Sequence, residues 1–79
     1  MSDFGEVLKA LKADKGGQLA FQRKGWNGKG MWIAIQYPSP DSDMTLPYIC
    51  MLTAQDELVP WLASQTDLLA DDWQLWEPA

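Results

Sequence analysis

Apolar residues near the start of the chain recur at three- and four-residue spacing, as on one face of a helix. The residues on this face are Phe4, Val7, Leu8 and Leu11. Ser2 or Asp3 can cap the start of the helix, and Gly16-Gly17 follows its end. We therefore predict an amphipathic helix that runs to about Lys12 or Ala13 and packs on a sheet.

Apolar and β-branched runs in the rest of the chain predict strands at residues 19–24, 31–36, 48–53, 58–59 and 73–76. The run 31–36 is almost wholly apolar, which predicts that it is covered on both faces. Pro60 ends the fourth run, and Ser64 or Thr66 can cap a short second helix. This order predicts an α+β fold in which an N-terminal helix and a short second helix pack on a mainly antiparallel β-sheet.

A glycine-rich turn joins the first two predicted strands, and residues 25–30 read Gly-Trp-Asn-Gly-Lys-Gly. Asn-Gly is a strong signal for a tight hairpin turn. Glycine also lets backbone N–H groups approach a ligand closely, because no Cβ is in the way. The spacing matches neither a Walker loop nor a dinucleotide fingerprint. The pattern by itself favours a hairpin that carries a Trp, and a ligand loop with a basic, aromatic rim is the second interpretation.

The length of the chain, 79 residues, allows one domain, which spans residues 1–79. A chain this short usually needs disulfides, a metal or oligomerisation for support. Cys50 is the single cysteine and there is no histidine, so the sequence offers neither an internal disulfide nor a common zinc site. Five tryptophans, a residue type enriched in interfaces and pockets, favour an oligomer or an unusually good core.

The net charge is −5, and it is divided along the chain. All six cations stand at or before Lys29, whereas residues 31–79 hold eight acids and no base. An acidic surface argues against a general nucleic-acid binder, but it leaves room for a small anionic ligand at Arg23, Lys24 or Lys29. No apolar run is long enough to span a bilayer. The lone cysteine and the lack of a signal peptide suggest that the protein works in a reducing cytosol.

Catalytic residues and metal ligands are not predicted. Without histidine, a Ser-His-Asp or Cys-His arrangement is impossible. Asp71 and Asp72 are adjacent in sequence and so do not share a face, which favours a solvated helix end over an acid–base pair.

The sequence offers more candidate residues for ligand binding than for catalysis. The faces of Trp26 and Trp61 can stack on bases. Ser64, Gln65 and Thr66 stand at a predicted helix start, which suits an anion, and Asp67 can accept a hydrogen bond from a ribose hydroxyl or a purine amino group. The alternative is that Trp61 is core and Ser64 only a cap, and the residue pattern alone favours that alternative.

Three stretches resemble a known family: Phe4–Lys12, Arg23–Met31 and Val59–Trp73. The chain is similar over nearly its whole length to the small phage and prophage Thoeris anti-defence proteins of the sponge type. It departs from them mainly at residues 38–46, a loop that is shorter here than in many members of the family.

The resemblance implies a non-catalytic sponge in the host bacterial cytoplasm that sequesters a cyclic ADP-ribose isomer, glyco-cyclic ADP-ribose, made by a defence sensor. It also implies a homotetramer with ligand pockets between subunits, and no cofactor. The ligand-binding residues expected on these grounds are Arg23, Trp26, Asn27, Lys29, Trp61, Ser64, Gln65, Thr66 and Asp67. Two alternatives stay open: a sponge for cyclic oligonucleotides of another defence system, and a phage adaptor that binds a host protein. The preferred isomer and the stoichiometry do not follow from the sequence.

Overall fold

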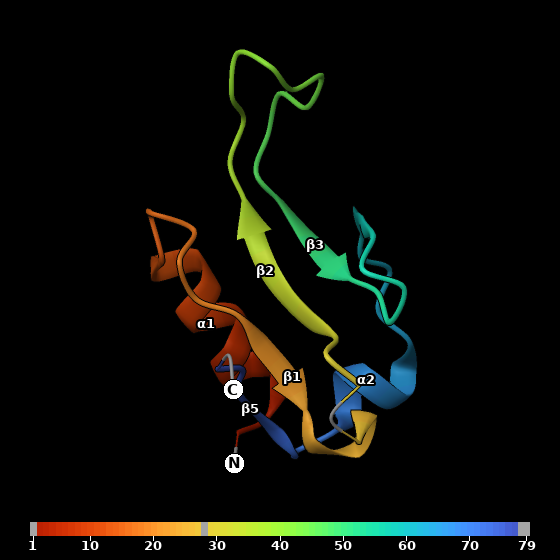
Figure 1. Cartoon of the computed structure of the whole chain (residues 1–79). Helices are drawn as coiled ribbons and strands as arrows, with labels where there is room; N and C mark the ends of the chain where they lie inside the picture. The colour runs from red at the N-terminus through yellow and green to blue at the C-terminus, as the bar shows by residue number, and fades with distance from the viewer. Residues whose placement is uncertain (1, 28, 78–79) are drawn as a thin grey trace.

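The computed structural model describes residues 2–27 and 29–77 (Figure 1). The elements are α1 (Phe4–Ala13), β1 (Phe21–Arg23), the single 3-10 turn η1 (Lys24–Trp26), β2 (Trp32–Gln36), β3 (Tyr48–Leu52), β4 (Leu58–Pro60), α2 (Gln65–Leu69) and β5 (Trp73–Leu75). The five strands form one sheet in the order β4-β3-β2-β1-β5, and every neighbouring pair is antiparallel. The predicted α+β class is confirmed, and the oligomeric state stays a prediction.

Helix α1 begins and packs as its sequence predicts. The Asp3 carboxylate accepts a hydrogen bond from the Glu6 N–H at 2.9 Å, so Asp3 is the cap. Val7 and Leu11 are buried, and Phe4 packs beside them. Leu8 was expected on the same face but is partly exposed, because it stands at the margin of the stripe that meets the sheet.

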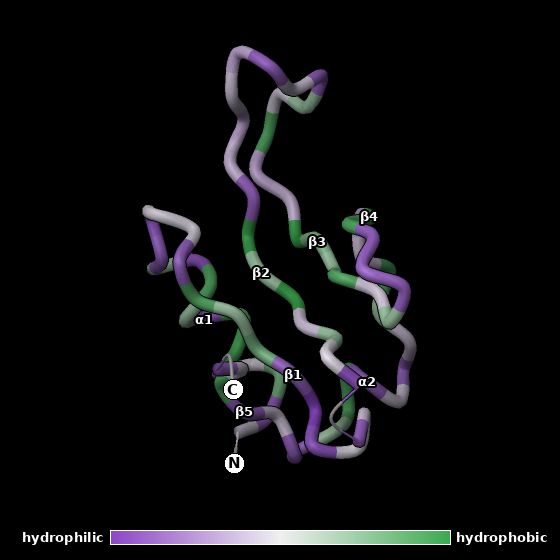
Figure 2. Tube along the Cα trace, viewed as in Figure 1, coloured by the Kyte–Doolittle hydropathy of each residue, from purple (hydrophilic) through white to green (hydrophobic). Residues whose placement is uncertain are grey.

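The core lies on one face of the sheet, between α1 and the central strands. Its buried cluster consists of Val7, Leu11, Phe21, Ile33 and Trp73. Phe21 is the cross-strand partner of Ile33 on β2 and of Leu75 on β5, so β1 brings the two neighbouring strands to this core. In Figure 2 hydrophobic residues follow β2 and β3. None of the helices in residues 2–27 and 29–77 is long and apolar enough to cross a membrane.

The strands depart from the prediction in two ways. Strand β2 was expected to be covered on both faces, but only Ile33 and Ala34 are buried, and its other residues are half-buried. Ile33 lies in the core cluster with residues of α1, and Ala34 is buried on the opposite face of the sheet, so one residue on each face is covered. Pro60 was expected to stop the fourth strand but belongs to β4, which an edge strand tolerates because the missing N–H can face outward.

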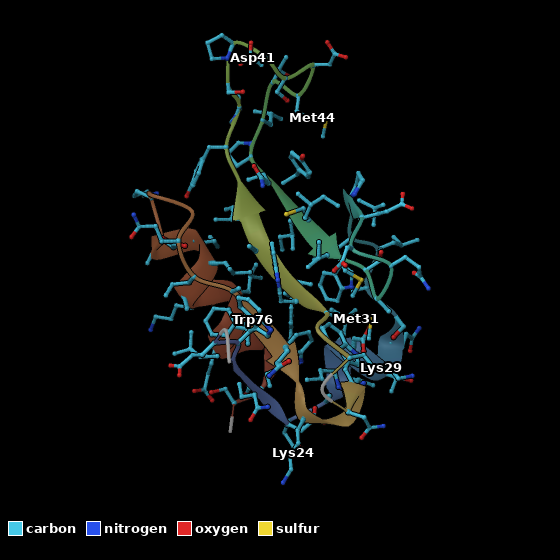
Figure 3. All side chains as sticks on the ribbon, viewed as in Figure 1. Lys24, Lys29, Met31, Asp41, Met44 and Trp76 are labelled. Atoms are coloured by element: carbon cyan, nitrogen blue, oxygen red, sulfur yellow. The ribbon has the colours of Figure 1, made fainter. Side chains whose placement is uncertain are left out.

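A long connection, residues 37–47, joins β2 to β3 and extends away from the sheet; we call it the arm (Figures 1 and 3). Its base is fixed, since the Tyr37 hydroxyl donates a hydrogen bond to the Asp14 carbonyl at 2.9 Å. The Asp14 carboxylate in turn accepts the Leu19 N–H at 2.7 Å, and this bond lowers the pKa of that carboxyl. The arm therefore leaves the fold from an anchored point.

Candidate functional site

The glycine-rich turn is compact and internally hydrogen-bonded. After β1 the chain makes the single turn η1, and Asn27 follows in the left-handed region at φ 58° and ψ 36°. The Asn27 N–H donates to the Lys24 carbonyl at 3.1 Å, and the Lys29 N–H donates to the Trp26 carbonyl at 3.4 Å. Gly28, which belongs to the predicted turn, lies outside the described residues. The exposed side chains of the turn are those of Lys24, Asn27 and Lys29.

Arg23, the last residue of β1, links this turn to two segments much later in the chain. Its Nη1 lies 2.9 Å from Asp67 Oδ1 on α2, and its Nε lies 2.9 Å from Asp72 Oδ1 just before β5. The Arg23 and Asp67 side chains are only 17% and 15% exposed. The hydrogen bonds that Arg23 donates, to Asp72 first and to Asp67 second, raise the pKa of Arg23 above its ordinary value.

Asp72 completes the connection. Its Oδ2 accepts the Gly25 N–H at 2.9 Å, and its carbonyl accepts the Lys24 N–H at 3.0 Å. The hydrogen bond from Arg23 is the main cause that lowers the pKa of the Asp72 carboxyl, and the Gly25 N–H adds to it. A Cβ at Gly25 would meet Asp72 Oδ2 at 3.1 Å, a tight contact, so the glycine gives the carboxylate room to approach the turn.

The expectation that Asp72 belongs to a solvated helix end is therefore wrong. Asp72 is half-buried and paired, whereas Asp71 is exposed. The signal for this pairing is the strand register, which the sequence alone does not give. Trp73 follows Asp72 directly and is the cross-strand partner of Arg23, so the register of the last strand places Asp72 beside the end of β1.

Ser64 caps α2, as one of the two predicted choices. Its Oγ accepts the Asp67 N–H at 3.1 Å, and its carbonyl accepts the Leu68 N–H at 3.0 Å. Thr66, the other choice, lies inside the helix, and its side chain is exposed, as is that of Gln65. The Asp67 carbonyl accepts the indole N–H of Trp73 at 3.0 Å, so α2 is attached to the core as well as to Arg23.

The two predicted stacking residues, Trp26 and Trp61, both pack against Trp73. Both rings meet Trp73 edge to face, at centroid distances of 5.3 Å and 5.9 Å. Trp61 also contacts Phe4 at 5.5 Å. Both residues are half-buried against the core cluster. Both tryptophans therefore contribute to packing. The sequence pattern favoured a core role for Trp61 more than for Trp26.

The structure brings together the two segments that were singled out for binding. Arg23 and Asp67 are 44 residues apart in sequence and in direct contact within one chain. The polar side chains around this junction are exposed: Asn27, Lys29, Ser64, Gln65 and Thr66. The described part of the chain forms no enclosed pocket and no group of ligands for a metal ion.

Comparison with known proteins covers most of the chain. The family model described as Tad2-like, the Thoeris anti-defense 2-like domain, matches residues 2–76. The protein named Thoeris anti-defense 2 from Bacillus phage SP01 is 36% identical over 87 aligned positions, which cover 91% of this chain and 91% of the relative. Both the glycine-rich turn and α2 fall inside the matched region. The chain therefore belongs to the Thoeris anti-defense 2-like family.

Proposed function

We propose that this chain counteracts Thoeris defence as a non-catalytic sponge, which binds a cyclic ADP-ribose-type signalling nucleotide and keeps it from its receptor. Membership of the Thoeris anti-defense 2-like family supports the biological role. The sponge mechanism and the ligand, glyco-cyclic ADP-ribose, are our proposal. In this proposal, the protein acts in the cytoplasm of the host bacterium, where the signal is made.

The observation that carries the proposal is the junction at Arg23. It fixes the glycine-rich turn against the start of α2 through two 2.9 Å contacts, to Asp67 and Asp72. Exposed polar side chains from both segments stand around this junction. A site whose parts are already held in place loses less conformational entropy when a ligand binds, which favours affinity.

The same geometry divides the expected roles. Arg23 donates hydrogen bonds to two carboxylates, so its role is to position the site. A pyrophosphate would instead be contacted by Lys29, Asn27 and exposed backbone of the turn. Helix α2 has five residues, so its dipole is small, and Gln65 and Thr66 contribute through their side chains. Trp26 offers a nucleobase the part of its ring that does not pack on Trp73.

We further propose that the chain works as a homo-oligomer, a tetramer on the family resemblance, with each ligand pocket between subunits. Support comes from the large apolar side chains left exposed on the single chain, among them Leu62 and Leu69. These residues also favour one competing function, an adaptor that binds a host protein through an apolar surface.

Incubation of the protein with glyco-cyclic ADP-ribose, followed by heating and chromatography, separates the competing functions. Intact nucleotide released on heating supports the sponge, degraded nucleotide indicates an enzyme, and no uptake supports the adaptor. Calorimetry against other cyclic ADP-ribose isomers and cyclic dinucleotides then identifies the preferred signal. A variant that replaces Lys29 with Gln serves as the control for uptake at the proposed site.

A further inference from the structure

Trp73, the first residue of β5, contacts both segments of the candidate site. Its side chain is fully buried. The ring of Trp26, from the glycine-rich turn, and the ring of Trp61, from the connection that leads into α2, each meet the Trp73 ring edge to face. Its backbone pairs with Arg23, the residue after which the turn begins. One core residue therefore joins segments that lie far apart in the sequence.

Helix α2 is attached to the sheet through Asp67. The helix has five residues, fewer than the roughly 12–15 that an isolated helix needs in water. Four of its residues are exposed and Asp67 is half-buried, so apolar burial holds α2 less firmly than it holds α1. Asp67 makes two contacts with the rest of the fold. Its carboxylate accepts a hydrogen bond from Arg23, and its carbonyl accepts the indole N–H of Trp73 at 3.0 Å.

The bond from the indole satisfies a backbone group that the helix itself leaves without a partner. The last four carbonyls of an α-helix have no acceptor role within the helix. Because α2 ends at Leu69 and Ala70 is extended, the Asp67 carbonyl is one of these four. Trp73 returns to this carbonyl from β5, six residues later. A Phe or Leu would fill the core but would not supply this donor, so the indole N–H does more than packing requires.

We infer that the indole N–H of Trp73 is a positioning group for the nucleotide site. It holds α2, which carries Gln65 and Thr66, beside the glycine-rich turn, which carries Lys29, so that a ligand meets both segments already in place. In Figure 1 α2 lies beside the turn that follows β1, at the end of the molecule opposite the arm. The effect on affinity rests on the proposed function, whereas the effect on the order of α2 needs no ligand.

An isosteric replacement removes the donor and keeps the shape of the ring. In 3-benzothienylalanine a sulfur atom stands in place of the indole N–H. The 79-residue chain can be assembled by peptide ligation at its single cysteine, Cys50, so the replacement is made in a synthetic fragment of residues 50–79. At Trp73 it should weaken binding of glyco-cyclic ADP-ribose about three- to tenfold in calorimetry, because one hydrogen bond is lost. The same replacement at Trp76, which packs against Trp32, is the matched control and should keep the affinity.

Hydrogen exchange measured by NMR tests the position of α2 without nucleotide. The Leu68 amide donates to the Ser64 carbonyl and so reports whether α2 is formed. In the unmutated protein the Leu68 amide and the Trp73 indole N–H should open together, because release of α2 exposes both. The replacement at Trp73 should lower the protection of the Leu68 amide about fivefold relative to the amides of β2 and β3. Urea denaturation checks that both replaced chains are folded.

Each result decides for or against the inference. Unchanged affinity after the replacement at Trp73 would overturn it, and so would unchanged protection of the Leu68 amide in a folded chain. If the replaced chain does not fold, the unmutated protein decides: a Leu68 amide that is unprotected, or that opens independently of the indole N–H, would also overturn it. Failure of the unmutated protein to bind the nucleotide would instead count against the sponge, and hydrogen exchange would still decide what positions α2.

Discussion

At the scale of single residues, Arg23 is the most connected side chain of the candidate site. It joins β1 to Asp67 and Asp72 with two donors whose fixed separation suits two carboxylates. A Lys cannot reproduce this arrangement, because it carries one charged group on a flexible stem. The stability of the site should therefore depend on the guanidinium itself.

Replacement of Arg23 by Gln should lower the free energy of unfolding by about 1–3 kcal/mol, because two largely buried carboxylates lose a charged partner. Replacement of the exposed neighbour Lys24 by Gln should change it by less than about 0.5 kcal/mol. Urea denaturation of both variants measures the difference. Equal, small effects would mean that solvent replaces the guanidinium without cost.

Asp72 should make the stability of the protein sensitive to acid. Its folded-state pKa lies below the ordinary value of 3.8, so its ionised form stabilises the fold above that value, and the contribution disappears as pH falls through the lower, folded pKa. The variant Asp72→Asn should be less stable than the unmutated protein at about pH 7 and closer to it at about pH 3. Urea midpoints at the two pH values measure this. A constant difference between the two proteins would contradict the assignment.

The residue-scale contacts were the hardest to predict from sequence. Arg23 and Asp72 are 49 residues apart, and no local spacing connects them. The sequence predicts Arg23 as a ligand contact, because basic residues beside a glycine-rich turn suit phosphates. Its two internal partners become visible only when the register of β1 and β5 is known. The packing of Trp26 was equally hard to predict, because its position in a turn does not indicate that the ring contacts Trp73.

At the scale of elements, the sequence predicted far more. Hydrophobic patterns predicted the first helix and all five strands in order, and capping residues predicted the short second helix. The ends of strands were less well predicted. The first strand was expected at residues 19–24 but ends at Arg23, where hydrogen bonds to Asp72 pull Lys24 and Gly25 into a turn. Tertiary contacts, which local sequence does not contain, set that boundary.

The glycine-rich turn, as an element, should supply the anion contact of the proposed site. Lys29→Gln should weaken nucleotide binding about three- to tenfold, since an exposed charged contact contributes about 1 kcal/mol. Lys9→Gln is the matched control, because Lys9 is also an exposed cation but lies on α1, away from the turn. Calorimetric titration measures both affinities. Equal losses in the two variants would indicate a general charge effect and no specific contact.

At the scale of the whole molecule, the acidic arm and the basic side chains of the glycine-rich turn lie apart. Figure 3 shows Lys24 and Lys29 at the end opposite the arm, which carries Asp41. Two arrangements of copies are therefore physically reasonable. One arrangement uses the exposed apolar residues of 58–69, here called the β4–α2 surface, and must overcome repulsion between two chains of charge −5. Contact between an arm and a glycine-rich turn would instead use attraction.

Salt distinguishes these two arrangements. If the β4–α2 surface forms the contact, the dissociation constant should fall severalfold between about 20 mM and about 500 mM NaCl, because salt screens the repulsion between copies. If acidic arms meet basic turns, the dissociation constant should rise over the same range. Sedimentation at the two salt concentrations gives the sign of the change, and a rise would exclude the apolar contact as the main one.

The arrangement of the tryptophans has a spectroscopic consequence. Trp26 and Trp61 meet Trp73 at 5.3 Å and 5.9 Å, and Trp32 lies 5.7 Å from Trp76. Indoles this close couple their electronic transitions, which produces paired bands of opposite sign in ultraviolet circular dichroism. The bands from the first group depend on how the glycine-rich turn is seated, because Trp26 is part of it. The protein thus carries an intrinsic optical reporter of its own candidate site, and the Trp32–Trp76 pair serves as an internal reference.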